Sequence, residues 1–168
     1  MTDLIASEIF DNLFLGGYTI AIDTKQLKEK GITKVLTVMD LQNGPNYNPE
    51  EFIHKRFNIT DNSQQNIIQY FGECINFIKG NEKILIHCLK GTSRSATIVI
   101  AYLMWYKKWK FEETYDFVKS KRFIYPNKGF REQLKIFEKL LVENNYDIDK
   151  INFNEIGNCE YQIKICKI

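Results

Sequence analysis

A histidine and a cysteine directly follow a short apolar segment near the middle of the chain, in KILIHCLKGTSRS. Arg94 comes six residues after Cys88, and a second apolar segment begins at position 96. A loop between a strand and a helix can direct successive backbone N–H groups, and the positive end of the helix, at one point. Gly91 permits the tight turn, and the planar guanidinium of Arg94 suits two oxygens of a tetrahedral anion. The segment 88–94 therefore predicts a phosphate site.

A cysteine in this electrostatic field is no ordinary thiol. Helix N termini and neighbouring cations lower the pKa of a cysteine from about 8.5 to between about 3.5 and 7.5. We therefore expect Cys88 to be a thiolate at neutral pH, placed for in-line attack on a bound phosphoryl group. Such a loop stabilises the developing charge with no metal and no cofactor. The residues expected to bind the phosphate are Leu89, Lys90, Gly91, Thr92, Ser93 and Arg94.

Cleavage of a phosphate ester also requires a proton for the leaving oxygen, which a carboxylic acid on a second loop can donate. Asp61 ends one predicted strand, whereas Asp40 follows another and precedes a long loop rich in asparagine and proline. We favour Asp61 and keep Asp40 as the alternative, although Asp61 could simply turn the chain. Ser95 could donate a hydrogen bond to the sulfur of Cys88 and help it leave a cysteinyl-phosphate. His87 would then brace the loop through its ring nitrogens.

The elements that must position these residues alternate in an α/β pattern. Apolar and alternating segments predict strands at 8–16, 32–39, 52–59 and 83–87. Helical spacing of apolar residues predicts helices at 21–30, 66–79, 96–106, 111–122 and 128–143. Segment 96–106 is apolar on every face, so we expect it to be buried in the centre of the domain. Cys74 lies on the apolar stripe of its helix, so we expect it to be a core residue.

Size and charge narrow the class of protein. The chain has 168 residues, of which 44% are hydrophobic, enough to bury the core of one domain. A net charge of +2 is too small to favour nucleic acid or a membrane surface as partner. The N-terminal segment lacks the basic region of a signal peptide, and the longest uncharged apolar segment is too short to span a bilayer. We therefore expect a monomeric cytoplasmic protein with access to the nucleus, without a membrane anchor and without bound nucleic acid.

The loop HCLKGTSRS resembles the signature of the dual-specificity phosphatases, a family of cysteine-dependent protein tyrosine phosphatases. That signature is His-Cys, two residues, Gly, one residue and Ser-Arg-Ser. The resemblance covers about residues 7 to 143. Further segments that resemble the family are IFDNLFLGG, LKEKGITKVLTV, ITDNSQQNIIQYFGECINFI, ATIVIAYLM and YPNKGFREQLKIFE.

The resemblance implies a central, mostly parallel sheet flanked by helices, and a small, atypical family member without a kinase-docking module. It implies that Cys88 is the nucleophile, that Arg94 binds the phosphate and that Asp61 is the general acid. It also implies that Ser95 assists hydrolysis and that Asn127 orders the phosphate loop through a hydrogen bond. We assign residues 1–146 to the catalytic domain and 147–168 to a C-terminal appendage, whose last segment, YQIKICKI, alternates like a strand.

The predicted function is hydrolysis of phosphotyrosine, phosphoserine and phosphothreonine in proteins through a cysteinyl-phosphate intermediate. Lys90 stands where the family usually carries alanine, and a cation there would favour acidic phosphopeptides or a phosphoinositide, unless it only points into solvent. Two alternatives remain. One is a phosphatase for a phosphoinositide or another non-protein phosphate, and the other is a catalytically weak phosphate-binding scaffold.

Overall fold

The computed structural model describes residues 4–40, 42 and 44–156. Two short strands come first and are followed by helices and strands in alternation, with a helical C-terminal part. The elements in chain order are β1 (Ser7–Phe10), β2 (Leu13–Gly16), α1 (Tyr18–Ile22), α2 (Thr24–Glu29), β3 (Ile32–Val38), β4 (Ile53–Phe57), the 3-10 helix η3 (Ile68–Tyr70), α3 (Phe71–Ile78), β5 (Lys83–His87), α4 (Arg94–Lys107), α5 (Phe111–Lys121), α6 (Lys128–Glu143), the 3-10 helix η4 (Ile148–Lys150) and α7 (Phe153–Ile156).

The sheet has five strands in the order β1-β2-β5-β3-β4. β2, β5, β3 and β4 run parallel to one another, and β1 pairs antiparallel with β2 at the edge. The connection from β2 to β3 carries α1 and α2, and the connection from β4 to β5 carries η3 and α3, whereas β3 and β4 are joined without a helix element in the described residues. The predicted central, mostly parallel sheet is therefore confirmed.

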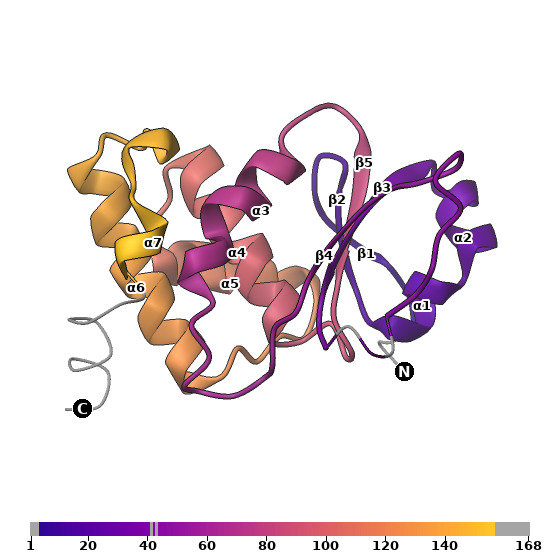
Figure 1. Ribbon diagram of the computed structural model, residues 1–168, viewed down its shortest axis with the longest axis horizontal. Coiled ribbons are helices and arrows are strands. Elements are labelled where there is room, and N and C mark those ends of the chain that lie inside the picture. The colour runs from indigo at the N-terminus through magenta and orange to yellow at the C-terminus, as the bar shows by residue number, and fades with distance from the viewer. Residues whose placement is uncertain (1–3, 41, 43, 157–168) are drawn as a thin grey trace.

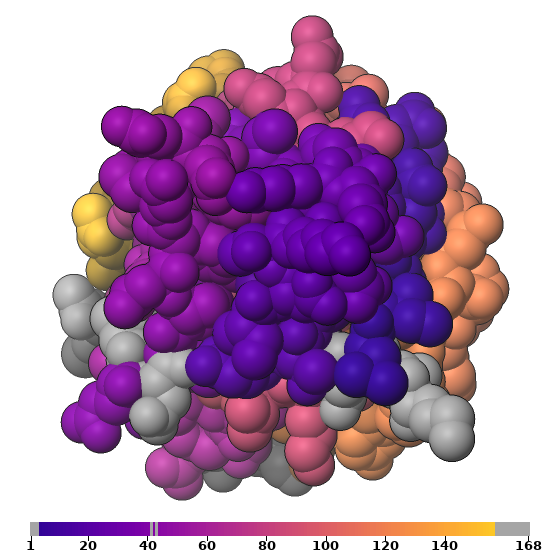
Figure 2. Space-filling model, turned by 90° about the vertical axis from the view of Figure 1, so that its right-hand side faces the viewer, coloured from indigo at the N-terminus to yellow at the C-terminus, as the bar shows by residue number. Residues whose placement is uncertain are grey.

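Helices cover both faces of the sheet (Figure 1), with α1 and α2 on one side and α3 to α7 on the other. Figure 2 shows the side that α1, α2 and the segments next to them cover. Residues on β3 alternate between the two layers: Val35 packs with Leu27 of α2, whereas Leu36 belongs to the larger core under α3, α4 and α6. The fold is thus a three-layer arrangement with two apolar cores of unequal size.

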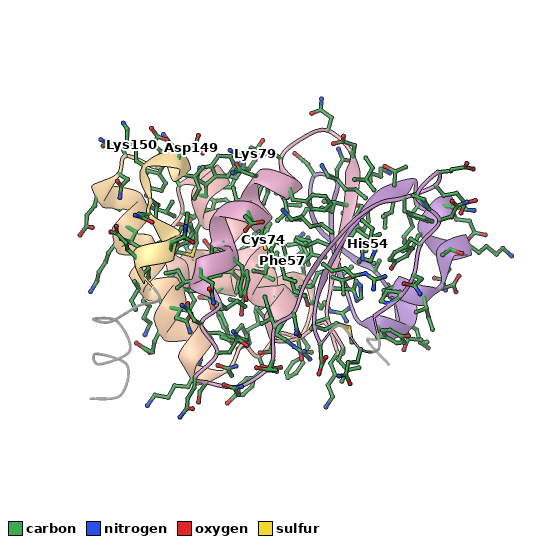
Figure 3. The ribbon with its side chains drawn as sticks, viewed as in Figure 1. His54, Phe57, Cys74, Lys79, Asp149 and Lys150 are labelled. Carbon is green, nitrogen blue, oxygen red and sulfur yellow. The ribbon has the colours of Figure 1, made fainter. Side chains whose placement is uncertain are left out.

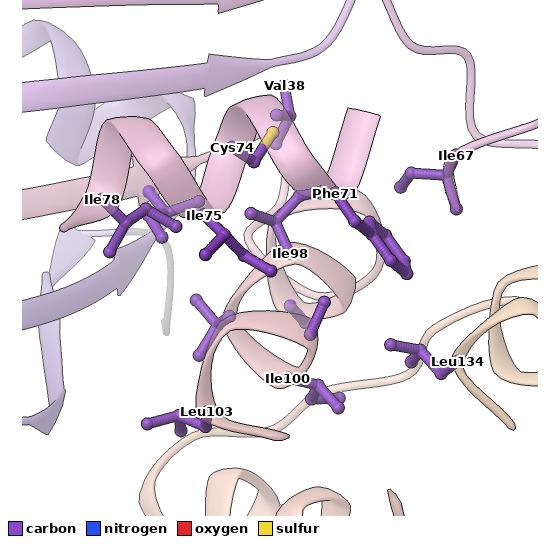
Figure 4. Packing of buried hydrophobic residues seen from close by; sticks show 14 of the residues in the cluster. Val38, Ile67, Phe71, Cys74, Ile75, Ile78, Ile98, Ile100, Leu103 and Leu134 are labelled. Carbon is purple, nitrogen blue, oxygen red and sulfur yellow. The ribbon is translucent and has the colours of Figure 1, made fainter. Parts of the chain in front are cut away.

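α4 is the central helix that the sequence predicts at 96–106. Ile98, Val99 and Ile100 are fully buried in the larger core, but Tyr106 in its last turn is 52% exposed. The expectation of burial along the whole segment is therefore wrong for its C-terminal end, where Tyr106 contacts Phe10 on only part of its surface. Cys74 on α3 is confirmed as a core residue and packs near Val38 (Figure 4), where burial raises the pKa of its thiol.

Two predicted elements are divided in the structure. The segment 8–16 forms a hairpin and not one strand, because Asn12 adopts a left-handed conformation with φ of 61° and reverses the chain. The predicted helix 21–30 breaks at Asp23, whose carboxylate accepts the backbone N–H of Gln26 at 3.0 Å and caps α2. Both breaks occur at a residue with a short polar side chain. Asp and Asn favour helix caps and turns over the interior of a helix or strand.

Residues beyond Tyr146 pack on the helical layer as far as the structure describes them. Ile148, Ile151 and Ile156 are buried, and the ring of Phe153 lies 6.1 Å from that of Phe137 on α6. The predicted strand-like segment at the C terminus lies outside the described residues, and the division at residue 146 stays a prediction. Within the described part, no helix is long and apolar enough to cross a membrane.

Candidate active site

The loop 88–93 lies at the carboxyl ends of the parallel strands, between the end of β5 and the start of α4. It packs against the end of β2, where the backbone N–H of Tyr18 donates to the carbonyl of Leu89 at 2.9 Å. Gly91 has a φ of +68°, and a side chain there would overlap the backbone of Gly16. Only glycine meets both conditions, so this position fixes the curl of the loop.

The sulfur of Cys88 lies inside this curl and is almost fully buried, with 1% of the residue exposed. Ser95 donates its hydroxyl proton to Sγ at 3.1 Å, and the backbone N–H of Gly91 donates to the same sulfur at 3.3 Å. Two donors are thus directed at one sulfur at the base of the loop.

Arg94, the first residue of α4, is 9% exposed and turns back toward the neighbouring loop 58–66. Its Nη1 donates to the carbonyl of Ile59 at 3.0 Å. Its Nε is buried and lacks a hydrogen-bond partner, and it lies 3.8 Å from Oδ2 of Asp61. A buried guanidinium with an unused donor is suited to an anion that supplies the missing acceptor.

Asp61 lies against the predicted phosphate loop, residues 88–94. Its Oδ1 accepts hydrogen bonds from the hydroxyl of Ser93 at 2.7 Å and from the side-chain amide of Asn127 at 3.0 Å. Asn127 also donates its backbone N–H to Oγ of Ser93 and caps α6 by accepting the N–H of Phe130 at 3.0 Å. Asn127 thus connects the phosphate loop, the Asp61 loop and the start of α6.

The alternative acid, Asp40, follows β3 and is exposed to solvent. Its carboxylate accepts the backbone N–H of Gln42 at 3.3 Å, which is a local turn contact. Among the residues that the structure describes, Asp61 and not Asp40 is hydrogen-bonded to the loop after Cys88.

Leu89 and Lys90, two further residues predicted to bind phosphate, are exposed on the rim of the loop. Thr92 is half-buried, and its carbonyl accepts the backbone N–H of Tyr125 at 2.7 Å. That bond places Tyr125, whose side chain is largely exposed, directly beside the phosphate loop. The loop therefore borders a second surface formed by the segment between α5 and α6.

His87 is fully buried and uses both ring nitrogens. Its Nδ1 is 3.3 Å from the carbonyl oxygen of Cys88, and its Nε2 is 2.7 Å from Oγ1 of Thr37 on β3. Burial lowers the pKa of His87 to about 4, and burial with the nearby charge of Arg56 lowers that of His54 to about 4. Both rings are therefore neutral at physiological pH.

Sequence reasoning missed Arg122, which supports the phosphate loop from outside. This buried arginine follows α5 and donates from Nε to the carbonyl of Gly91 at 3.1 Å and from Nη2 to that of Lys90 at 3.3 Å. Another of its nitrogens donates to the carbonyl of Ile5. A single arginine at a helix end gives no periodic signal, so only the folded contacts identify it.

Gln133 on α6 holds the Asp61 loop and was also missed. Its Oε1 accepts the backbone N–H groups of Ile67 and Ile68 at 2.8 and 3.0 Å, and its Nε2 donates to the carbonyl of Gln65 at 2.9 Å. Gly129, one turn earlier, lies so close to the backbone of Ser63 that a side chain would overlap it. Both residues lie in the segment YPNKGFREQLKIFE, whose resemblance to the family gave no role to either of them.

Comparison of this chain with known protein families, sequences and structures agrees with this geometry. The family model described as "Dual specificity phosphatase, catalytic domain" matches residues 13–140. The chain belongs to the dual specificity phosphatase family. It is 44% identical over 140 residues to "MAP kinase phosphatase with leucine-rich repeats protein 1" of Dictyostelium discoideum, which covers 81% of this chain. It is 40% identical over 143 residues to "Dual specificity protein phosphatase 1B" of Arabidopsis thaliana, which covers 82%.

This family member spans different shares of its relatives: 16% of the Dictyostelium protein and 84% of the Arabidopsis protein. Among solved structures it is similar to the human tyrosine phosphatase-like serine/threonine/tyrosine-interacting protein, with a TM-score of 0.78 and 33% identity over 82% of this chain and 97% of that one. A mouse putative dual specificity phosphatase complexed with zinc tungstate has a TM-score of 0.77 and 27% identity over 84% and 91%. The family resemblance that the sequence predicts is therefore confirmed, as is the enzyme class, at the level of the family.

The buried His87 and the half-buried His54 predict how the stability of this dual specificity phosphatase domain depends on pH. Their pKa values of about 4 lie below the value of 6.5 for an exposed histidine. Between pH 6.5 and 4 the unfolded chain therefore binds protons that the folded protein does not, so the free energy of unfolding falls as the pH falls through this window. Urea unfolding at a series of pH values should show this slope, and His54→Gln should reduce it. Equal slopes for both proteins would contradict the assignment.

Proposed function

We propose that this chain is a protein phosphatase that hydrolyses phosphotyrosine and phosphoserine or phosphothreonine through a cysteinyl-phosphate intermediate. The observation that carries the proposal is the buried sulfur of Cys88, which accepts hydrogen bonds from Ser95 and Gly91 next to a buried arginine with an unused donor. This combination joins a nucleophile with an anion site in one loop. Its reaction needs no metal or cofactor.

In the first step, Sγ of Cys88 attacks the phosphorus and the bond to the ester oxygen breaks. Asp61 gives its proton to the leaving oxygen, and the phosphoryl group remains on the sulfur. The phosphoryl oxygens bind the N–H groups of loop 88–94 and the guanidinium of Arg94. In the second step, water attacks the phosphorus, Asp61 takes the proton of that water, and the sulfur leaves as a thiolate that the hydroxyl of Ser95 stabilises.

The contacts of Asp61 support its exchange between the two roles. In the unliganded site its carboxylate lies 3.8 Å from Nε of Arg94 and accepts two hydrogen bonds. A bound phosphoryl dianion competes with Asp61 for that guanidinium. Substrate binding thus frees Asp61 from Arg94 and leaves it beside the leaving oxygen.

A groove beside the loop supports protein substrates over small phosphates. It has a volume of about 730 Å³ and lies between α5 and α6. Phe123 and Tyr125 on its rim are each 63% exposed, and Lys128 and Arg131 add positive charge. The backbone hydrogen bond between Tyr125 and Thr92 joins this groove to the phosphate loop. The peptide segment on one side of a phosphorylated residue can therefore lie in the groove. Exposed Lys90 would favour acidic residues on the same peptide.

The alternatives make different use of the same site. A phosphoinositide phosphatase would not require the apolar part of the groove. A scaffold would bind phosphate without turnover, and the fold alone does not decide this, since the similar human protein is named as a phosphatase-like interacting protein. The complete set of Cys88, Arg94 and Asp61 favours the enzyme. A cytoplasmic location and a monomeric state stay predictions.

Replacing the nucleophile tests the proposal directly. Cys88→Ser should abolish phosphate release from phosphotyrosine and phosphothreonine peptides in the presence of EDTA, because the hydroxyl is a far weaker nucleophile, yet it should still bind tungstate. Cys74→Ala, which changes the second buried thiol of the part that the structure describes, should keep turnover. Activity that survives in Cys88→Ser, or a wild-type protein that binds tungstate without turnover on any phosphate ester, would overturn the proposal.

The general acid is tested through the leaving group. Asp61→Asn should lower kcat by about 100-fold or more for phosphothreonine, whose alkoxide leaving group needs a proton, and by much less for p-nitrophenyl phosphate. Asp40→Asn should leave both rates unchanged. If Asp61→Asn leaves the rate on phosphopeptides unaltered, another acid such as Asp40 must serve.

The groove is tested by comparing a peptide with a small substrate. Tyr125→Ala should raise KM for a phosphopeptide several-fold without changing KM for p-nitrophenyl phosphate, which is too small to reach the groove. Tyr106→Ala is the matched control, because this exposed tyrosine lies in the last turn of α4, about 20 Å along the helix from the loop. Equal KM values for Tyr125→Ala and wild type would rule out the groove as a peptide site.

A further inference from the structure

Four polar side chains follow one another across the sheet on the face that α1 and α2 cover. They are His87 on β5, Thr37 on β3, and His54 and Arg56 on β4. In the register of the sheet, Thr37 stands beside both His87 and Arg56, and His54 comes two positions before Arg56. Residues two apart on a strand point to the same face. Figure 3 shows His54 on this side of the sheet.

These side chains form an unbroken row of hydrogen bonds. Arg56 Nε lies 3.4 Å from Nδ1 of His54, and Nε2 of His54 lies 2.8 Å from Oγ1 of Thr37. The same hydroxyl is 2.7 Å from Nε2 of His87, whose Nδ1 is 3.3 Å from the carbonyl oxygen of Cys88. Thr37 and His87 are completely buried. The row thus connects a charged residue on β4 with the peptide group of the nucleophile.

The two ends of the row determine which atom donates in every bond. A guanidinium only donates, and a carbonyl oxygen only accepts. Nδ1 of His54 must therefore accept, so that its proton is on Nε2 and is donated to Thr37. The hydroxyl of Thr37 then donates to Nε2 of His87, and Nδ1 of His87 donates to Cys88. In the reverse order, an N–H of His54 would face the N–H of Arg56, and a lone pair of His87 would face a lone pair of the Cys88 carbonyl oxygen.

The charge state of both rings agrees with this order. Each neutral imidazole has one N–H and one acceptor nitrogen, which is what the row requires. Burial, together with the positive charge of Arg56, keeps the pKa of both histidines at about 4. Neither ring therefore carries a second proton at neutral pH.

We propose that Thr37, His54 and Arg56 are positioning residues that fix the tautomer of His87 and hold the peptide group of Cys88 in place. The proposal rests on the proposed phosphatase function and names further residues for it. Every link directs its hydrogen toward Cys88, so the positive ends of the dipoles face the nucleophile and each bond strengthens the next. The row holds the nucleophile in place without touching substrate.

The loop after Asp40 holds the remote end of this row. Arg56 donates to the carbonyl of Pro45 and to the side-chain oxygen of Asn46 at 2.8 Å. The rings of Tyr47 and His54 form a T-shaped pair, with their centroids 4.6 Å apart, and the Tyr47 hydroxyl donates to the carbonyl of Ala21 at 2.6 Å. These contacts fix the plane of the His54 ring and the direction of the arginine.

The tautomers can be read directly, because the chain contains two histidines. Protein labelled with ¹⁵N-histidine should give, in two-bond ¹H–¹⁵N spectra at pH 7, one ring protonated at Nδ1 and one protonated at Nε2. Nuclear Overhauser contacts of each ring in the wild-type protein should assign the Nδ1–H ring to His87, so that the row stays intact during the measurement. The opposite tautomers, or a doubly protonated ring at pH 7, would overturn the proposal. This measurement needs no turnover, so its outcome is independent of the phosphatase assignment.

Kinetics test whether the row acts on the nucleophile. Thr37→Val should lower kcat for p-nitrophenyl phosphate about tenfold or more with little change in KM, and Thr37→Ser should restore it. Thr114→Val is the matched control, because it removes another fully buried hydroxyl, on α5, which donates to the carbonyl of Lys110 at 2.8 Å. A folded Thr37→Val with the kcat of wild type would refute the role.

A second variant covers the case in which Thr37→Val does not fold. Arg56→Met removes the donor that fixes His54 at the half-buried end of the row. The ¹⁵N spectra should then show His54 in both tautomers, and kcat should fall while KM stays the same. Unchanged His54 signals in this variant would show that the arginine does not set the order of the row.

Discussion

Outward-facing carbonyl groups are the constraint on which the phosphate site depends. Five consecutive carbonyls of the loop, from residue 88 to residue 92, accept hydrogen bonds from groups outside the loop. A buried carbonyl requires a donor, and when its partner lies outside the curl, the N–H groups of the loop can face inward. The donors are His87, Tyr18, Arg122 and Tyr125, which come from the end of β5, the start of α1 and the segment after α5.

This constraint explains why so much of the fold serves one short loop. β2 delivers the tight contact at Gly91, α4 begins beneath the loop, and the segment after α5 closes its outer side. The anion site is thus built mainly from backbone, and the side chains that matter most, Cys88 and Arg94, stand at its two ends. Other polar side chains, such as His87 and Arg122, hold peptide groups of the loop and do not meet the substrate themselves.

The proposed catalytic loop could be located from sequence because its chemistry is local. Cys88, Gly91, Arg94 and Ser95 lie within eight positions, and the strand and helix on either side have clear apolar patterns. Asp61 was favoured over Asp40 for its place before the Cys88 strand, and the structure brings it to the loop. Helices 111–122 and 128–143 were predicted nearly to the residue, since each has a distinct amphipathic period.

Other parts could not be predicted because they depend on contacts between distant segments. Arg122 reaches the loop across 31 positions and Gln133 reaches the Asp61 loop across 66. Such single polar residues have no period and no neighbouring partner. The break between α1 and α2 and the turn between β1 and β2 were not predicted for the opposite reason: a local Asp or Asn residue outweighed a longer apolar pattern.

The close approach of Gly129 to Ser63, together with the three hydrogen bonds of Gln133, has a consequence for the movement of the segment that carries Asp61. The segment that carries Asp61 is held to α6 at both its middle and its end, and these contacts restrict how far it can move away from the loop that holds Cys88.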